Sequence, residues 1–325
     1  MIQLAIVGYG NLGRGVETAV RQNPDIKLTA VFTRRDPEKI TLQTPGVPVL
    51  KLEQLESWTD RLDVLILCGG SATDLPEMTP ALATKCNVID SYDNHSQIPA
   101  HIAKVHQAAQ AAGKTAIVAC GWDPGMFSLA RVYAQAALPQ GQTYTFWGPG
   151  LSQGHSDAIR RIPGVVDARQ YTVPVEQALD QVRSGSNPEL TTRQKHTRHC
   201  YVVAEEGADQ TAIARQIRQM PGYFADYDTF VTFISKETLE EEHSAMPHGG
   251  FVIRSGEDAE GNRHTIEYSL KLESNPKFTA GILVACARAA VRMHKRGEIG
   301  CFTMPEVRPC DLLADTLDDI RAHMI

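Results

Sequence analysis

The sequence predicts an α/β fold in which a doubly wound parallel sheet is interrupted by a second, α+β domain. Short apolar runs alternate with amphipathic stretches over residues 1–120, and a glycine-rich turn joins the first run to the first amphipathic stretch. Longer segments of alternating polarity follow residue 127. Strand–helix alternation with a glycine turn is typical of a Rossmann-type sheet.

The apolar runs define the expected parallel sheet. They occupy residues 2–7, 26–32, 63–68, 87–90 and 115–120. Their continuous Val, Ile, Leu and Ala content suits strands that are covered on both faces. Helices are expected from Asn11 to about Gln22 and from Ile98 to about Ala112, because Asn23-Pro24 and Gly113 supply stop signals.

The second half of the chain has a different pattern. Strands are expected at residues 170–174, 199–205, 227–235 and 264–272, in a mixed or antiparallel sheet with one covered face. A long helix is expected over 274–297, since Pro276 suits its first turn and Gly297 lies past its end. We therefore expect one domain of residues 1–121 plus about 276–325, and an inserted domain of residues 122–275.

Composition excludes several classes of protein. The 325 residues carry a net charge of −6 without a long run of one sign, which gives a nucleic-acid role no support. Seven cysteines without a CxxC pair indicate neither a disulfide framework nor a zinc site. The N-terminus is a poor signal peptide, and no apolar run approaches the roughly 18 residues of a membrane span. The expectation is a soluble, cytoplasmic protein without a metal.

The glycine-rich turn points to a dinucleotide. Residues Gly8, Tyr9, Gly10, Asn11, Leu12 and Gly13 fit GxGxxG, directly after a strand and at the start of a helix. The glycines let the backbone approach a pyrophosphate, whose charge the helix N-terminus favours. The alternative, a glycine-rich turn without a ligand, is disfavoured by this context.

The end of the second strand indicates which dinucleotide. NAD-binding proteins usually place Asp or Glu there, whereas this chain has Thr33, Arg34 and Arg35. A hydroxyl and two guanidinium groups suit the 2′-phosphate of NADP, although a solvated basic pair is the alternative. Asp36 more readily begins a turn with Pro37. The small residues of segment 68–73 would close over the ribose and pyrophosphate.

Four further stretches have the composition of a ligand cleft: SYDNH (91–95), GWDPGMF (121–127), FWGPGLSQGHSDAIRRIPG (146–164) and MPHGG (246–250). With AIVGYGNLGR, TRR, GSATD and NPKFTA, they make the chain closely resemble the meso-diaminopimelate dehydrogenase family from residue 5 to about 280. The resemblance implies a homodimer that uses NADP to deaminate meso-diaminopimelate oxidatively at its D-centre. The products would be L-2-amino-6-oxopimelate, ammonia and NADPH, in lysine and cell-wall precursor metabolism.

The substrate, a diacid with two ammonium groups, explains why acids are needed. Asp93 and Asp123 are expected to bind the reacting amino group and to orient the Cα–H, while the cofactor accepts the hydride. The general base stays open between Asp93, Asp123 and a bound water. The alternative is that both acids only form Asx turns beside Gly and Pro.

The resemblance also implies the remaining contacts. Arg198 would bind the distal carboxylate, Trp147 would wall the aliphatic chain, and Gln153 and Gly154 would donate near the reacting carboxylate. The expected substrate-binding residues are Asp93, Asp123, Trp147, Gln153, Gly154, Thr172, Arg198, His248 and Asn275. The expected cofactor-binding residues are Gly8, Tyr9, Gly10, Asn11, Leu12, Gly13, Thr33, Arg34, Arg35, Cys68, Gly69, Gly70, Ser71, Thr73, Tyr92, Asp93, Asn94, Cys120, Gly121, Trp122, Asp123 and Pro124.

Each distal residue has a structural alternative. Trp147 could be core, Arg198 could lie on a solvated face beside Lys195, His248 could be a plain loop histidine, and Asn275 could only cap a helix. Two other classes compete for the whole chain. One is an NADP-dependent reductase of the glucose-fructose oxidoreductase or dihydrodipicolinate reductase type, and the other is a non-catalytic NADP sensor.

Overall fold

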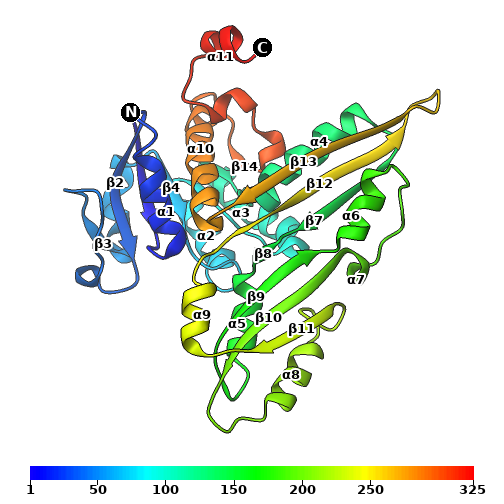
Figure 1. The fold of residues 1–325 in the computed structure, drawn as a ribbon. Helices are drawn as coiled ribbons and strands as arrows, with labels where there is room; N and C mark the ends of the chain where they lie inside the picture. Colours follow the sequence, from blue (N-terminus) through cyan, green and yellow to red (C-terminus); the bar gives the residue numbers. More distant parts are fainter. The chain divides into compact units, whose positions relative to one another are not determined.

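The computed structural model describes residues 1–325, which form two compact units (Figure 1). The first unit comprises Met1–Leu129 and Pro276–Ile325, and the second comprises Ala130–Asn275. No helix combines the length and the apolar character needed to cross a bilayer.

The first unit contains the expected doubly wound sheet. Its parallel strands lie in the order β14-β6-β5-β4-β1-β2-β3. The strands are β1 (Ile2–Val7), β2 (Ile26–Thr33), β3 (Val49–Lys51), β4 (Val64–Leu67), β5 (Asn87–Asp90), β6 (Thr115–Ile117) and β14 (Gly300–Phe302). The sheet reverses its direction of growth between β1 and β4, the switch point where such folds bind ligands.

Alternation along the strands builds a core on each face of this sheet. Leu4 and Ile6 pack with α1 (Asn11–Val20) and α10 (Asn275–Lys295), whereas Ala5 and Val7 pack with α2 (Leu75–Ala83) and α3 (Ile98–Ala111). Because successive side chains point to opposite faces, a continuous apolar run fills both cores. The short helix α11 (Leu317–His323) lies near the C-terminus.

The second unit contains two smaller sheets, ordered β11-β10-β9-β8 and β13-β12-β7. Their strands are β7 (Gln142–Trp147), β8 (Gly150–Leu151), β9 (Val165–Pro174), β10 (His196–Ala204), β11 (Asp228–Phe233), β12 (His248–Glu257) and β13 (Arg263–Leu272). The first sheet is mixed, because β10 pairs antiparallel with β9 and parallel with β11. The expected mixed or antiparallel pairing is confirmed, but the strands lie in two sheets rather than one, since the strand expected at 264–272 is β13 of the second, antiparallel sheet.

The remaining helices are mostly short. They are α4 (Phe127–Ala137), α5 (Gln153–Arg160), α6 (Glu176–Arg183), α7 (Thr192–Lys195), α8 (Gln210–Arg218) and α9 (Lys236–Glu242). One apolar cluster fills the space between β9, β10, α5 and α8, and includes Ile159, Ala168, Val202 and Ile217. The same face of β9 and β10 continues beyond this cluster to the buried polar residues Thr172 and Arg198.

Candidate active site

The loops that follow β1, β2 and β4 in the first unit line a pocket with an empty volume of about 600 Å³. Its lining includes eight of the expected cofactor residues: Gly8, Tyr9, Gly10, Thr33, Arg34, Arg35, Cys68 and Gly69. These loops leave the carboxyl ends of strands on both sides of the switch point, where a dinucleotide binds in this fold. Asn11 and Leu12 begin α1, and Gly13 is buried in its first turn.

At two positions of the turn, backbone conformation or close packing favours glycine over any other residue. Gly8 has φ +94°, a conformation that side chains disfavour. A Cβ on Gly13 would stand 2.3 Å from the carbonyl oxygen of Gly8, so only glycine lets the helix start this close to the turn. The backbone is thereby shaped for the close approach of a phosphate group.

Both arginines after β2 are already held by neighbouring loops. Arg34 donates to Oδ1 of Asp74 at 2.8 Å, and Arg35 donates to the carbonyl oxygen of Tyr9. Thr33 is buried and its hydroxyl accepts from the backbone N–H of Arg35 at 3.0 Å. Asp74, which the sequence did not suggest, is kept ionised because the Gly70 N–H and Arg34 lower the pKa of its carboxyl group.

Asp36 does not take the place of the acid that NAD-binding proteins use. Its side chain accepts from the backbone N–H of Glu38 and caps the short turn Pro37–Lys39. The interpretation of Asp36 as the start of a turn is therefore confirmed. The end of β2 presents guanidinium groups to the pocket rather than a carboxylate.

The loops after β4, β5 and β6 carry the other residues expected near the cofactor. Ser71 links two of these loops, because its hydroxyl accepts from the Asp93 N–H at 3.2 Å and lies 3.5 Å from the Ser91 carbonyl oxygen. Gly70, Thr73, Asp93 and Asn94 are exposed, whereas Tyr92, Cys120, Gly121 and Trp122 are buried and Asp123 and Pro124 are half-buried. The two acids therefore lie in loops of one unit, both accessible to solvent.

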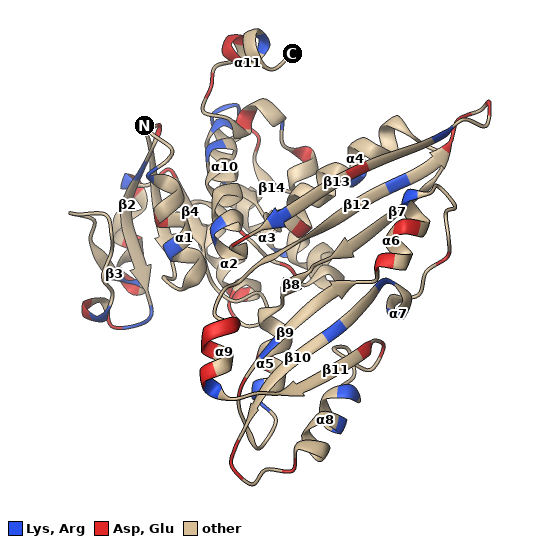
Figure 2. Cartoon of the chain, in the orientation of Figure 1, with Lys and Arg blue, Asp and Glu red and all other residues tan.

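In the second unit, Arg198 on β10 is buried, with 6% of its surface exposed. Its side chain donates to the hydroxyl of Thr172 on β9, and its guanidinium carbon lies 3.8 Å from the centre of the Tyr227 ring. Figure 2 shows that the surrounding strand is otherwise free of Lys, Arg, Asp and Glu. The interpretation of Arg198 as part of a solvated face is wrong, because its side chain lies on the buried face of β10.

No acid neutralises this cation. Burial lowers the pKa of the Arg198 guanidinium, and the groups that oppose the shift are Tyr227 and Cys200 rather than a carboxylate. Its Nε–H group is buried without a hydrogen-bond partner. A buried cation with spare donors has the properties of an anion site.

Three neutral imidazoles lie within the electrostatic influence of Arg198. Burial, followed by the charge of Arg198, lowers the pKa of His155 to about 4 and that of His196 to about 3. The pKa of His248 is lowered to about 4 by the same two causes. Arg198 is thus the charged group of this cluster near neutral pH. His248 is the half-buried first residue of β12 rather than a plain loop histidine.

His196 also holds Trp147. Its Nε2 accepts from the Trp147 backbone N–H at 2.8 Å, and the two rings stack with centroids 5.4 Å apart. Trp147 itself is half-buried at the end of β7, so it is not an enclosed core residue. Neither His196 nor Tyr227 was expected from the sequence, since nothing in their local context marks them.

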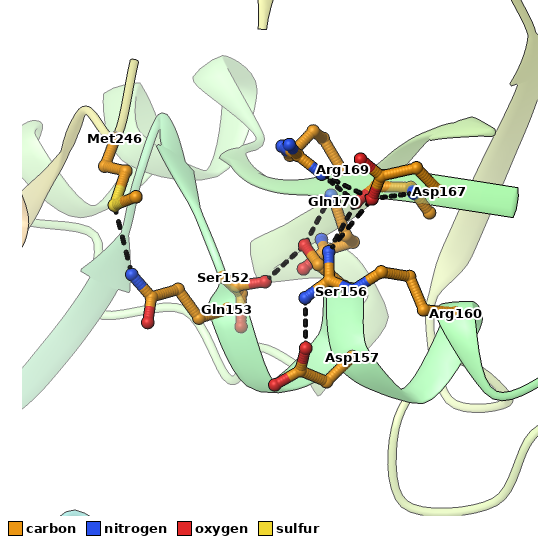
Figure 3. Close-up of polar contacts among 10 residues, drawn as sticks. Ser152, Gln153, Ser156, Asp157, Arg160, Asp167, Arg169, Gln170 and Met246 are labelled. Carbon is orange, nitrogen blue, oxygen red and sulfur yellow. Dashed lines mark hydrogen bonds and ion pairs between the residues drawn. The ribbon is translucent and has the colours of Figure 1, made fainter. Parts of the chain in front are cut away.

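Gln153 and Asn275 converge on a further residue, Met246. The amide of Gln153, at the exposed start of α5, lies 3.1 Å from the Met246 sulfur (Figure 3). The backbone N–H of Asn275, the first residue of α10, donates to the Met246 carbonyl oxygen at 3.0 Å. Gly154 is exposed beside Gln153. The structure therefore brings the 153–154 and 275 segments together.

The fold, the glycine-rich turn and the arginine-lined pocket are those of a dinucleotide-dependent oxidoreductase. Residues 121–274 match the family described as "Diaminopimelic acid dehydrogenase C-terminal domain". Meso-diaminopimelate D-dehydrogenase of Ureibacillus thermosphaericus is 55% identical, over 100% of this chain and 99% of its own. The chain belongs to the meso-diaminopimelate D-dehydrogenase family, which excludes the competing reductase and sensor classes.

Two solved structures support the same assignment. Corynebacterium glutamicum diaminopimelate dehydrogenase in complex with diaminopimelate superposes with a TM-score of 0.93 and 50% identity, covering 100% of this chain and 99% of that one. An engineered D-amino acid dehydrogenase bound to NADP⁺ has a TM-score of 0.88 and 49% identity, with coverage of 100% and 99%. These matches also fit the NADP preference expected from Arg34 and Arg35.

Proposed function

We propose that this protein catalyses the reversible NADP-dependent oxidative deamination of meso-2,6-diaminopimelate at its D-centre. Water is consumed, and L-2-amino-6-oxopimelate, ammonia and NADPH are formed. The observation that carries the proposal is Arg198, a buried guanidinium that has spare donors and no acid beside it. A distal carboxylate at the far end of a long amino acid supplies the missing anion.

The other expected residues receive roles that their surroundings support. Thr172, already bonded to Arg198, would share the distal carboxylate with His248 and Asn275. Trp147 offers a ring face to the aliphatic chain, and Gln153 and Gly154 offer donors near the reacting carboxylate. Asp93 and Asp123 would bind the reacting amino group, and one of them, or a water held by them, would take its proton.

The first unit would hold NADP through the expected cofactor residues. Thr33, Arg34 and Arg35 would bind the 2′-phosphate, and the turn from Gly8 to Gly13 would bind the pyrophosphate. The bound nicotinamide supplies the hydride acceptor. The residues of the chain hold the D-centre with its Cα–H directed at that acceptor, and orientation supplies a large part of the rate enhancement.

The two domains expected from the sequence would have different binding roles. Residues 1–121 with about 276–325 would bind NADP, and residues 122–275 would bind substrate and dimerise. Exposed Ile266 and half-buried Tyr268 and Leu270 on one face of β13 support a homodimer, since a partner would cover them. Seven free thiols support a reducing, cytoplasmic location.

The proposal is tested by comparing meso-diaminopimelate with two D-amino acids that each lack one distal group. D-lysine lacks the distal carboxylate and D-2-aminopimelate lacks the distal amino group. We expect kcat/KM for D-lysine to be lower by on the order of 100-fold, the effect of losing a charge-assisted carboxylate contact, and that for D-2-aminopimelate to fall less. Equal kcat/KM for D-lysine and the meso diacid would contradict the proposal.

A further inference from the structure

One buried carboxylate has no part in the roles assigned above. Asp90 is the last residue of β5 and is 0% exposed. Its Oδ1 accepts from the backbone N–H groups of Tyr92 at 3.1 Å and Ala119 at 2.9 Å. Its Oδ2 accepts from the Thr79 hydroxyl at 2.8 Å and lies 2.7 Å from Nε2 of His101.

The two hydrogen bonds to Oδ1 come from the loops that carry Asp93 and Asp123. Tyr92 directly precedes Asp93, and Ala119 begins the segment that leads to Asp123. The carbonyl oxygen of Asp90 also accepts from the Cys120 N–H at 2.9 Å, so Asp90 fixes two consecutive residues of the second loop. One residue therefore sets the starting point of both loops.

Ala119 shows how firmly this loop is held. Its φ of +55° lies in the left-handed region, which residues other than glycine seldom occupy. Such a conformation is energetically unfavourable and persists where the surroundings overdetermine it. The hydrogen bond from Ala119 to Asp90 is one such constraint, and the burial of Ala119 is another.

The Oδ2 contacts anchor the carboxylate to two helices. Thr79 lies on α2 and His101 on α3, and both are buried. The His101 ring also stacks on Tyr92, with centroids 4.1 Å apart and planes at 19°. His101 thus supports the first loop both directly and through Asp90.

We propose that Asp90 is a positioning residue that holds Asp93 and Asp123 in register for the reaction. Because Asp90 is fully buried, it acts through the two loops rather than by contact with a ligand. This inference rests on the proposed function, because the reaction gives the register of the two acids its purpose. Loss of the carboxylate frees both loops together, since the Tyr92 and Ala119 donors share one oxygen atom.

Asp90→Ala is compared with Asn87→Ala, a matched control on the same strand. Asn87 is buried, and its side chain accepts from the Thr115 N–H at 2.9 Å and donates to the Asp63 carbonyl oxygen at 2.8 Å, so it ties strands rather than loops. In Asp90→Ala we expect backbone amide exchange in segments 91–95 and 118–124 to accelerate by about 10-fold or more. Asn87→Ala should leave exchange in these segments unchanged while lowering the melting temperature.

Kinetics supply the second measurement. With meso-diaminopimelate deuterated at the D-centre, Asp90→Ala should lose about 100-fold in kcat/KM and show a larger isotope effect, because misplaced acids slow the hydride step. Asn87→Ala should keep the isotope effect of the unmodified protein at a temperature where it is folded. Thr79→Val, which removes only one donor to Oδ2, should change both measurements in the same direction as Asp90→Ala but less.

The possible outcomes distinguish the positioning role of Asp90 from the proposed function of the protein. Exchange and isotope effects in Asp90→Ala that equal those of Asn87→Ala would overturn the positioning role. If Asp90→Ala does not fold, unchanged loop exchange and isotope effect in Thr79→Val would overturn it instead. Absence of turnover by the unmodified protein would overturn the proposed function, whereas the exchange data would still report whether Asp90 holds the loops.

Discussion

The Arg198 guanidinium lies over the ring of Tyr227, with its central carbon 3.8 Å from the ring centre. The aromatic face stabilises the cation. Thr172 accepts from one of its N–H donors, and Nε–H has no partner. An arginine held in this way can bind a carboxylate without first breaking an internal ion pair, which would cost free energy on binding.

Removing the Arg198 charge should affect substrate binding more than folding. We predict that Arg198→Met raises the KM for meso-diaminopimelate by roughly 10- to 150-fold, since a hydrogen bond to a charged group contributes about 1.5–3 kcal/mol. The melting temperature should stay equal or rise, because a buried unpaired cation is lost. Arg169→Met on β9 is the control, as Arg169 pairs with Asp167. An unchanged KM would remove Arg198 from the site.

The arginine pair should determine the cofactor preference. We predict that Arg34→Ala with Arg35→Ala raises the Kd of NADP by about 100-fold and changes that of NAD little, because only NADP carries the 2′-phosphate. Titration of protein fluorescence with each cofactor measures this. Arg21→Ala, which removes an exposed arginine bonded to Gln43, serves as the control. A preserved NADP preference in the double variant would contradict the assignment.

Asp123 should matter for turnover rather than for stability. We predict that Asp123→Asn lowers kcat/KM by about 100-fold, in the range typical of a lost acid–base or orienting group. The side chain is half-buried, and asparagine preserves its shape, so the melting temperature should change little. A variant that melts much earlier but turns over normally would instead support a loop-forming role.

The neutral histidines predict acid sensitivity of the second unit. Because the folded pKa values of His155 and His248 are lowered from 6.5 to about 4, the unfolded chain binds these protons first as the pH falls. Their contribution to stability is complete above pH 6.5 and is lost between pH 6.5 and about 4, by about 1.4 kcal/mol per pH unit for each imidazole.

Thermal denaturation at several pH values measures this effect. His155→Gln should flatten the decline of the melting temperature between pH 6.5 and 4, because one protonation site is removed. His323→Gln, at the exposed end of α11, should leave the decline unchanged. Identical pH dependence in His155→Gln and the unmodified protein would show that His155 is not buried in its neutral form.

The sequence predicted the sheet of the first unit well, because strands covered on both faces have uninterrupted apolar runs. The strand over 87–90 agrees with β5, and the helix over Asn11 to about Gln22 ends only slightly earlier, at Val20. β12 was missed because MPHGG has the composition of a loop. Within the sheet, a Cβ on Gly249 or Gly250 would stand 2.1 Å from a neighbouring carbonyl oxygen, so glycine is required by close strand packing.

Some residues of the candidate site could be predicted from the sequence, and others could not. Gly8 and Arg34 could be predicted because each lies in a short motif whose neighbouring residues indicate its role. Tyr227, His196 and Asp90 could not, because their importance comes from contacts with residues distant in sequence. The polar neighbours of Arg198 suggested an exposed face, whereas strand alternation in β10 buries every second residue.

The most direct measurement of the central claim is NADPH formation from the meso, LL and DD isomers of diaminopimelate in parallel, each with NADP and with NAD. We expect rapid turnover of the meso isomer with NADP, little with NAD and none of the LL isomer, which has no D-centre. Turnover of the LL isomer at the rate of the meso isomer, or no turnover of any isomer while NADP binds, would contradict the proposed function.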